Sequence, residues 1–182
     1  MLRVIAGKYR HIKLEQPDSK ITRPTTDKVR EAVFSSLQFK IADKKCLDLF
    51  SGSGAWSIEA MSRGANSVDA IELNKSAYKV IQKNIQAVKE NNINLINTDA
   101  KLFIEKTSKT YDFIFMDAPF KETELVNHIL EKIAEKEILN PDGEIIIETD
   151  VQDKIVIPER FRIFKEKNYS KINLIYVCRV ED

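Results

Sequence analysis

Leu47-Asp48-Leu49-Phe50-Ser51-Gly52-Ser53-Gly54-Ala55 is the stretch on which the fold of this 182-residue chain depends. Its first half is apolar and predicts a buried strand over Cys46–Phe50. Gly52 and Gly54 indicate a tight turn, because glycine adopts positive φ angles and lets a ligand approach the backbone. The residues that follow predict a helix over Ala55–Ser62. A strand, a glycine turn and a helix in this order are typical of an α/β fold with a parallel sheet.

Strands and helices alternate from residue 44 onward, which predicts a parallel sheet wrapped by helices. The expected strands are Cys46–Phe50, Val68–Leu73, Asn94–Thr98, Tyr111–Asp117 and Gly143–Thr149, and the expected helices are Ala55–Ser62, Lys75–Asn91, Lys101–Lys106 and Glu124–Lys136. The last two β-rich runs have no helix between them and are expected to pair antiparallel at the sheet edge. These runs are Phe161–Lys167 and Lys171–Val180.

The first 40 residues differ from the rest in charge and are expected to form an extension of the main domain, residues 41–182. They hold nine Lys or Arg against four Asp or Glu, although the whole chain has a net charge of +1. A hairpin over residues 2–14 and a helix capped at Thr26 or Asp27 are predicted here. The positive charge favours contact with nucleic-acid phosphates, with ordinary solvated charge as the open alternative. The candidate contacts are Arg3, Lys8, Arg10, His11, Arg23 and Arg30, of which Arg23 and Arg30 suit a ligand's carboxylate equally well.

Composition excludes several classes of protein. The longest apolar runs are as short as strands, so no membrane span is expected, and the first residues do not resemble a signal peptide. Cys46 and Cys178 are the only cysteines, so no disulfide framework is expected and the cytoplasm is the expected location. No close set of Cys and His residues indicates a metal site. We expect a monomer.

Two further carboxylates end strands of the predicted sheet, at the edge where such folds bind ligands. Glu72 lies twenty residues after Gly52, where a carboxylate accepts hydrogen bonds from both ribose hydroxyls of a nucleoside. A cap on the next helix is the alternative role of Glu72. Asp99 is expected to accept the adenine amino group, while the Ala100 N–H donates to the ring. The alternative role of Asp99 is to cap the helix Lys101–Lys106.

Two nucleoside cofactors compete for this site. A nicotinamide dinucleotide carries a pyrophosphate, which binds helix-terminal amides away from anions. The chain has Ser57 in place of a third glycine and Asp48 close to the turn, where a carboxylate repels a pyrophosphate but attracts the ammonium group of a methionine moiety. S-adenosylmethionine therefore fits better. The residues predicted to bind it are Asp48, Ser51, Gly52, Gly54, Glu72, Leu73, Asp99 and Ala100.

Asp117-Ala118-Pro119-Phe120 follows the fourth predicted strand and carries the acceptor chemistry. The exocyclic amino group of a nucleobase is a poor nucleophile, because its lone pair is delocalised into the ring. The Asp117 carboxylate and the Ala118 carbonyl are each expected to accept one N–H, Pro119 to fix the backbone, and Phe120 to stack on a base that has left its helix. A strand-end turn and a core aromatic are the alternative roles.

With these motifs in place, the sequence resembles the bacterial methyltransferases that modify N2 of one guanine in the 16S RNA of the small ribosomal subunit. The resemblance covers nearly the whole chain and rests on four stretches. It implies a class I S-adenosylmethionine-dependent (Rossmann-like) fold, with a seven-stranded sheet whose last strand is antiparallel. It also implies an N-terminal hairpin that helps to hold RNA, and action on an assembling subunit. The stretches are Arg3–Arg10, Thr22–Glu31, Leu47–Gly54 and Asp117–Phe120.

One departure from the family pattern leaves alternatives open. Members usually carry two prolines after the aspartate, and here the first is Ala118, which keeps the carbonyl but frees φ. The leading hypothesis is methyl transfer to guanine N2 of ribosomal RNA. The alternatives are an RNA-binding assembly factor with little catalysis, and an amino-methyltransferase that acts on another nucleic acid or on a protein amide. A dinucleotide oxidoreductase ranks last.

Overall fold

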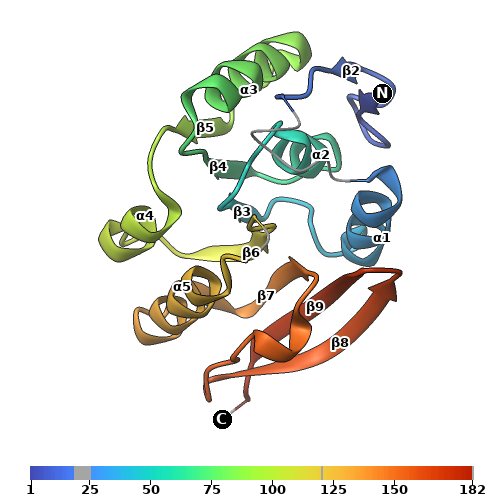
Figure 1. Cartoon of the computed structure of the whole chain (residues 1–182). Helices are drawn as coiled ribbons and strands as arrows, with labels where there is room; N and C mark the ends of the chain where they lie inside the picture. The colour runs from blue at the N-terminus through green and yellow to red at the C-terminus, as the bar shows by residue number, and fades with distance from the viewer. Residues whose placement is uncertain (19–25, 120, 182) are drawn as a thin grey trace.

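A seven-stranded mixed sheet with helices on both faces and a small two-stranded sheet beside it form the computed structural model of the chain (Figure 1). The model describes residues 1–18, 26–119 and 121–181. The strands are β1 (Leu2–Arg3), β2 (Lys13–Leu14), β3 (Lys45–Asp48), β4 (Ser67–Ile71), β5 (Ile93–Ile96), β6 (Tyr111–Met116), β7 (Leu139–Thr149), β8 (Phe161–Tyr169) and β9 (Ile172–Arg179). The helices are α1 (Asp27–Leu37), α2 (Ala55–Ser62), α3 (Lys75–Val88), α4 (Ala100–Lys106), α5 (Thr123–Glu135) and the 3₁₀ turn η1 (Gln152–Lys154).

The order of strands in the large sheet is β5-β4-β3-β6-β7-β9-β8. Neighbouring strands are parallel from β5 to β7, and β9 is antiparallel to both β7 and β8. The predicted fold class and the antiparallel pairing of the tail are therefore confirmed. The chain moves outward from β3 to β5 and then returns to β6, so the strand order reverses between β3 and β6. Ligands of open α/β sheets bind at such a point.

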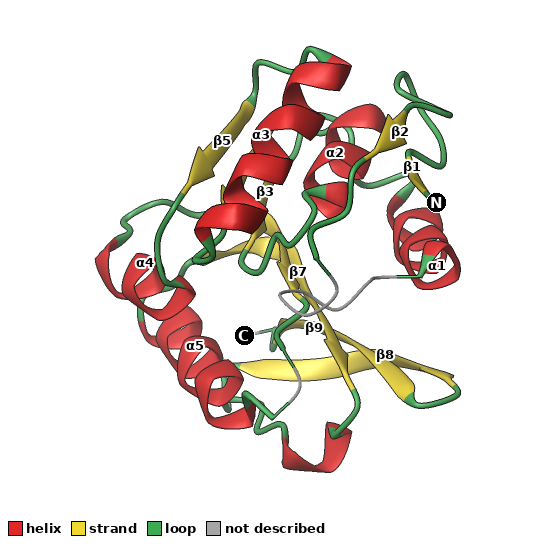
Figure 2. Cartoon of the chain, turned by 45° about the horizontal axis from the view of Figure 1, so that its top comes forward, coloured by secondary structure: helices red, strands yellow, loops and turns green. Residues whose placement is uncertain are grey.

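Two apolar layers sandwich the sheet, and Figures 1 and 2 show α1, α2 and α3 on one side of it and α4 and α5 on the other. Alternate residues of each strand face the two layers, as Cys46 and Leu47 of β3 do. Leu2, Val4 and Leu14 of the N-terminal hairpin belong to the same core layer as α1 and α2. The hairpin is therefore packed onto the sheet domain. Among the described residues, no helix combines the length and apolar character needed to cross a bilayer.

Most predicted elements are present, with α2 at its predicted bounds and β7 as the largest difference. That strand was predicted to start at Gly143 after an Asn-Pro-Asp-Gly turn, but it begins at Leu139. Tyr111 of β6 pairs with Leu139, whereas Phe113 pairs with Glu144. A bulge thus absorbs the turn-forming residues within the strand.

A buried carboxylate on α2 fastens the N-terminal hairpin. Glu59 is fully buried and accepts hydrogen bonds from the backbone N–H groups of Ile5 and Ala6, at 2.9 and 3.0 Å. The Nε atoms of Arg63 and Arg30 lie 2.9 and 3.6 Å from its oxygens. The prediction that Arg30 contacts RNA is wrong, because this side chain is fully enclosed and serves as a partner of Glu59.

The tip of the same hairpin rests on the last turn of α2. Gly7 has φ +86°, and a Cβ atom there would lie 2.0 Å from the Ser62 carbonyl oxygen. The backbone N–H of Lys8 donates to that oxygen at 2.9 Å. Because α2 runs from the glycine turn at Gly54 to Ser62, about 12 Å along its axis, the hairpin tip lies at the end of α2 that is away from the turn.

Candidate functional site

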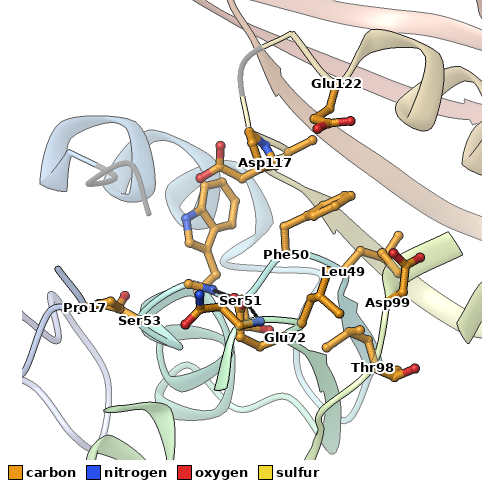
Figure 3. Close-up of a pocket in the computed structure, with 18 of the residues that line it drawn as sticks. Pro17, Leu49, Phe50, Ser51, Ser53, Glu72, Thr98, Asp99, Asp117 and Glu122 are labelled. Carbon is orange, nitrogen blue, oxygen red and sulfur yellow. Dashed lines mark hydrogen bonds between the residues drawn. The ribbon is translucent and has the colours of Figure 1, made fainter. Parts of the chain in front are cut away.

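A cavity of about 700 Å³ opens where the carboxyl ends of β3, β4, β5 and β6 meet (Figure 3). The glycine turn contributes Ser51 and Gly52, and the loop after β6 contributes Asp117 and Ala118. Figure 3 shows Asp117 and Glu122 across the cavity from Ser51 and Glu72. One cavity therefore joins the two motifs that the sequence analysis assigned to donor and acceptor. The predicted site residues that line it are Ser51, Gly52, Glu72, Leu73, Asp99, Ala100, Asp117, Ala118 and Pro119.

Glu72 holds the glycine turn in place. One oxygen of its carboxylate accepts a hydrogen bond from the Gly52 N–H at 2.8 Å, and the other accepts from the Asn74 N–H at 2.9 Å. Gly52 has φ +58°, a conformation that favours glycine. Burial raises the pKa of Glu72. This carboxylate therefore lines the cavity and also organises the start of α3, and its contact with ribose hydroxyls stays a prediction.

Gly54 is required for packing. It has φ +80°, and a Cβ atom at this position would lie 2.9 Å from Cγ2 of Ile81 on α3. It precedes the first residue of α2 and is buried. Gly54 is not among the residues that line the cavity, which corrects its predicted contact with the donor. Its lack of a side chain lets α2 and α3 approach each other.

Asp48 lies beneath the turn. It is 2% exposed and does not line the cavity, so the predicted direct contact with the donor is also corrected. The Ser57 hydroxyl donates to Oδ2 of Asp48 at 2.7 Å, which explains a serine at the position of a third glycine. Burial, with the charges of Asp117 and Glu72 as smaller causes, raises the pKa of Asp48 to about 7. Its charge can act on a bound cation only through the turn.

Asp99 caps α4 and also lines the cavity. Its Oδ1 atom accepts hydrogen bonds from the backbone N–H groups of Lys101 and Leu102, at 2.8 and 3.2 Å. Both bonds end on the same oxygen, and a carboxylate has a second oxygen for a ligand. The cap and the contact with adenine are therefore compatible. Leu73 lines the rim of the cavity, and 63% of its surface is exposed. A bound ligand could cover this apolar side chain.

The acceptor loop begins where β6 ends, at Met116. Asp117 and Ala118 line the cavity and Pro119 is exposed beside them. The Ala118 side chain is 8% exposed and belongs to the core layer of α4 and α5. The predicted stacking residue Phe120 lies outside the described residues.

The predicted RNA contacts separate into three groups. Arg3, Lys8, Arg10 and His11 are exposed, but the last three sit at the hairpin tip, away from the cavity. The Lys8 ammonium lies 3.5 Å from Glu90, just past the end of α3. Arg30 is buried, as described above, and Arg23 lies outside the described residues. Lys8, Arg10 and His11 therefore lie at some distance from the cavity, whereas Arg3 follows Leu2, which lines it.

Sequence reasoning missed several cavity residues, because their elements approach the site only in the folded chain. Leu2, Gln16 and Pro17 of the N-terminal extension line the cavity, although their sequence shows no ligand-binding signal. Trp56 lines it and packs against Phe34 and Phe115. Position 56 follows the glycine turn directly, which could have placed it there. The other missed residues are Leu49, Phe50, Ser53, Ile71, Asn74, Lys75, Thr98, Glu122 and Leu125.

The lining of the cavity is acidic. Glu72, Asp99, Asp117 and Glu122 line it, against Lys75 as the cation among its described residues. An excess of carboxylates favours a positively charged ligand. S-adenosylmethionine has a sulfonium and an ammonium group against one carboxylate, so it carries a net positive charge and suits this lining. Within the described ranges, no group of three or more His, Cys, Asp or Glu residues has the arrangement of a metal site.

The fold, the cavity and the relatives named below together define the class of protein, a methyltransferase with the class I S-adenosylmethionine-dependent fold. The chain belongs to the family described as Conserved hypothetical protein 95, whose model matches residues 2–178. The resemblance found in the sequence is thereby confirmed.

Individual relatives agree with this assignment. The chain is 33% identical to ribosomal RNA small subunit methyltransferase D of Escherichia coli strain K12, over 91% of this chain and 84% of that protein. It is similar to the solved structure of a putative methyltransferase from Escherichia coli, with a TM-score of 0.88 and 30% identity over 98% of this chain and 97% of that one. A putative S-adenosylmethionine-dependent methyltransferase from Streptococcus mutans shares the fold, with a TM-score of 0.63 and 19% identity over 84% and 48% of the two chains.

Proposed function

We propose that the protein transfers a methyl group from S-adenosylmethionine to the exocyclic N2 amino group of a guanine in 16S ribosomal RNA of the small subunit. The relative from Escherichia coli named above supports ribosomal RNA as the substrate. The observation that carries the proposal is the single cavity lined by both the glycine turn and the loop at Asp117. A donor and an acceptor bound in one cavity can be aligned for reaction, and such alignment can lower a barrier by about 7 kcal/mol or more.

The residues around the glycine turn would hold the donor. S-adenosylmethionine supplies an electrophilic methyl group on a sulfonium. Glu72 and Asp99 both line the cavity. In this proposal Glu72 accepts hydrogen bonds from the ribose hydroxyls and Asp99 accepts one from the adenine amino group. Gly52 allows a close approach to the backbone. Beneath them, the buried Asp48 adds negative charge that favours a bound cation.

The loop after β6 would prepare the acceptor. The Asp117 carboxylate and the Ala118 carbonyl oxygen each accept one N–H of the guanine amino group, which moves the nitrogen toward tetrahedral geometry and directs its lone pair at the methyl group. Asp117 lines the cavity opposite Glu72 (Figure 3). The guanine has to leave its stack to enter, which costs a few kcal/mol. We assign the stacking role to Phe120, and we expect the reaction in the cytoplasm on an assembling subunit by a monomer.

Incubation with tritiated S-adenosylmethionine and small subunits from a strain that lacks the gene tests this function. We expect label in the RNA, and N2-methylguanosine after nuclease digestion and mass spectrometry of the nucleosides. Label in a protein or in another nucleoside would overturn the assignment of the acceptor. Tight binding to subunits without any label would instead support an assembly factor that does not methylate, the alternative raised by Ala118.

A further inference from the structure

A row of lysines lies where α1 packs over the β8–β9 hairpin, on a surface that the sequence analysis did not single out. We call it the lysine face and define it by Lys28 of α1, Lys40 in the turn that follows α1, and Lys165 and Lys167 of β8. Lys28, Lys40 and Lys167 are exposed and Lys165 is half-buried. The cavity is built from β3 to β6, so this surface belongs to a different part of the sheet.

Strand register places the two lysines of β8 on the side of the sheet that α1 covers. Lys165 pairs with Tyr176 and Lys167 pairs with Leu174, and both partners belong to the core layer of α1 and α2. Glu166 pairs with Ile175 of the opposite layer, so it points away. Lys165 and Lys167 therefore extend in the same direction, about 6.6 Å apart along the strand.

Aromatic rings alternate with these cations. The Lys28 ammonium lies 5.8 Å from the ring centre of Tyr169, and that of Lys165 lies 4.9 Å from the ring centre of Tyr176. The Lys40 ammonium lies 5.9 Å from the ring centre of Phe164. Tyr176 is buried, whereas the rings of Phe164 and Tyr169 are half-buried. Positive charge beside accessible rings is the composition that binds single-stranded nucleic acid.

The lysine face carries more positive charge than its own carboxylates balance. Among the described residues, the lysine face forms one ion pair with a carboxylate, in which Oε2 of Glu144 lies 3.0 Å from the Lys40 ammonium. Burial, followed by the charges of Lys167 and Lys40, lowers the pKa of Lys165. Lys40, Lys165 and Lys167 therefore repel one another, while the carboxylate of Glu144 pairs with Lys40. A polyanion laid across them would relieve this repulsion.

The orientation of β8 connects this surface to the cavity edge. Because β9 is antiparallel to both β7 and β8, β8 runs in the same direction as β7 and β6. Tyr169 at the end of β8 is therefore at the same edge of the sheet as the loop that begins at Asp117. The lysine face starts at this edge, beside the N-terminal turn of α1, and leads away from it.

We propose that the lysine face binds the phosphodiester backbone of the RNA strand that flanks the target nucleotide. This inference rests on the proposed function for the identity of the RNA, but the contact itself is independent of sequence. Tyr169 stands nearest the cavity edge and offers a ring to a flanking base. The backbone would then pass over Lys28 and Lys167 and continue toward Lys165 and Lys40.

The test measures binding of a fluorescent 20-nucleotide oligouridine and of small ribosomal subunits to the full chain over a range of salt concentrations. The variant is Lys165→Gln with Lys167→Gln. Lys165→Arg with Lys167→Arg keeps the charge, and Lys79→Gln with Lys106→Gln removes the same charge from exposed positions on α3 and α4. Thermal unfolding and gel filtration establish that each variant is folded and monodisperse.

For the glutamine pair we expect about 10-fold weaker oligouridine binding at 0.1 M salt. The slope of log K against log salt should become less steep by about 1.4, since each phosphate contact on a single strand contributes about 0.7. The arginine pair and the α3/α4 pair should stay within about 2-fold of wild type. An unchanged affinity and slope in the folded glutamine pair would overturn the proposal.

The two remaining outcomes separate the lysine face from the proposed function. If the glutamine pair loses binding to subunits but keeps oligouridine binding, the surface contacts a ribosomal protein and the RNA proposal fails. If oligouridine binding falls as expected while wild type transfers no label to ribosomal RNA, the lysine face stands and the methyl-transfer proposal fails. For an active wild type, the glutamine pair should raise KM for subunits about 10-fold and leave kcat unchanged.

Discussion

The buried carboxylates of Glu59 and Asp48 lie toward opposite ends of α2 and have opposite electrostatic environments. Glu59, toward the hairpin, receives two backbone N–H groups and faces two guanidinium groups. Asp48, behind the glycine turn, receives the Ser57 hydroxyl, and no Lys or Arg of the described residues forms an ion pair with it. Both side chains are at most 2% exposed. Hydrogen bonds and guanidinium groups thus compensate the buried charge of Glu59, whereas the charge of Asp48 is left largely uncompensated.

This difference separates structure from function. A carboxylate whose partners are supplied by the protein itself holds two parts of the fold together. A carboxylate that is buried without a cation makes the fold less stable but favours a cationic ligand nearby. Glu59, which fastens the N-terminal hairpin to α2, is a carboxylate of the first kind. Asp48, beneath the glycine turn of the cavity, is one of the second kind. Substitutions in the two regions should therefore change different measurements.

Asp117→Ala should have the largest effect, and it should fall on activity alone. We expect kcat to drop about 1000-fold, the range seen when a positioned acceptor or donor of the transition state is lost, with S-adenosylmethionine affinity within about 3-fold. Single-turnover label transfer and calorimetry measure the two quantities. Glu122→Gln, on the same cavity, is the matched control. Activity of Asp117→Ala equal to that of the control would remove Asp117 from the mechanism.

Glu59→Gln should have the opposite signature. It removes the buried charge partner of Arg30, which keeps the partly exposed Asp27 at 3.1 Å, and breaking a buried pair in this way costs about 3 kcal/mol of the free energy of unfolding. Tm should fall by about 6 to 12 °C for a chain of this size. Urea unfolding checks the value. Glu105→Gln removes an exposed carboxylate that pairs with His128 and should cost less than about 0.5 kcal/mol; equal losses in both variants would contradict the comparison.

Asp48→Asn should change the dependence of stability on pH. Burial raises the pKa of Asp48 to about 7 in the folded chain, whereas in the unfolded chain it is about 3.9. The folded state therefore binds a proton that the unfolded state has released, and wild-type stability falls as pH rises from about 4 to 7. The slope is about 1 kcal/mol per pH unit. Asn cannot ionise, so the variant should lack this component.

Urea unfolding of the donor-free proteins at pH 5, 6 and 7 checks this prediction for Asp48. The stability of Asp48→Asn relative to wild type should increase with each step in pH. Curves for the two proteins that stay parallel over this range would show that the carboxylate does not titrate in the window that its burial implies.

The smallest expected effect compares the methyl donor with its demethylated product. S-adenosylhomocysteine lacks the sulfonium charge, so the acidic lining should favour S-adenosylmethionine by about 1 kcal/mol, or about 5-fold in Kd. Asp48→Asn should reduce this preference, because it removes one negative charge near the donor. Calorimetry at pH 8, where Asp48 of wild type is ionised, measures both ligands. A ratio that the variant leaves unchanged would show that the charge of Asp48 does not reach the donor.

The sequence predicted the elements best where local signals and tertiary structure agree. Gly52 and Gly54 separate a strand from a helix, and α2 has its predicted bounds. In β7, the Asn-Pro-Asp-Gly signal predicted a boundary, but pairing with β6 continues on both sides of a bulge. The turn-forming residues favour a break in the strand at this point. Pairing with β6 outweighs that preference and sets the bounds of β7.

Site residues at the ends of strands could be predicted from the sequence, whereas the prediction failed for a residue whose position depends on packing between helices. The carboxyl ends of parallel strands meet at one edge, so Glu72, Asp99 and Asp117 could be placed together from sequence. Arg30 could not be placed, because its partner Glu59 lies on another helix. A sequence signal existed nonetheless: a single carboxylate within an otherwise apolar helix, such as Glu59, indicates a buried partner.

The outermost strand of the sheet carries a further consequence. Within the part of the chain that the structure describes, β8 pairs on one side only, with β9, and edge strands of this kind can pair with a second chain unless charged side chains oppose it. Arg162, Lys165 and Lys167 are spaced along β8. Lys165 and Lys167 of the lysine face, together with Arg162, are thus charges of the kind that oppose pairing between the edge strands of two copies. We expect that replacing these three cations with apolar residues would promote aggregation.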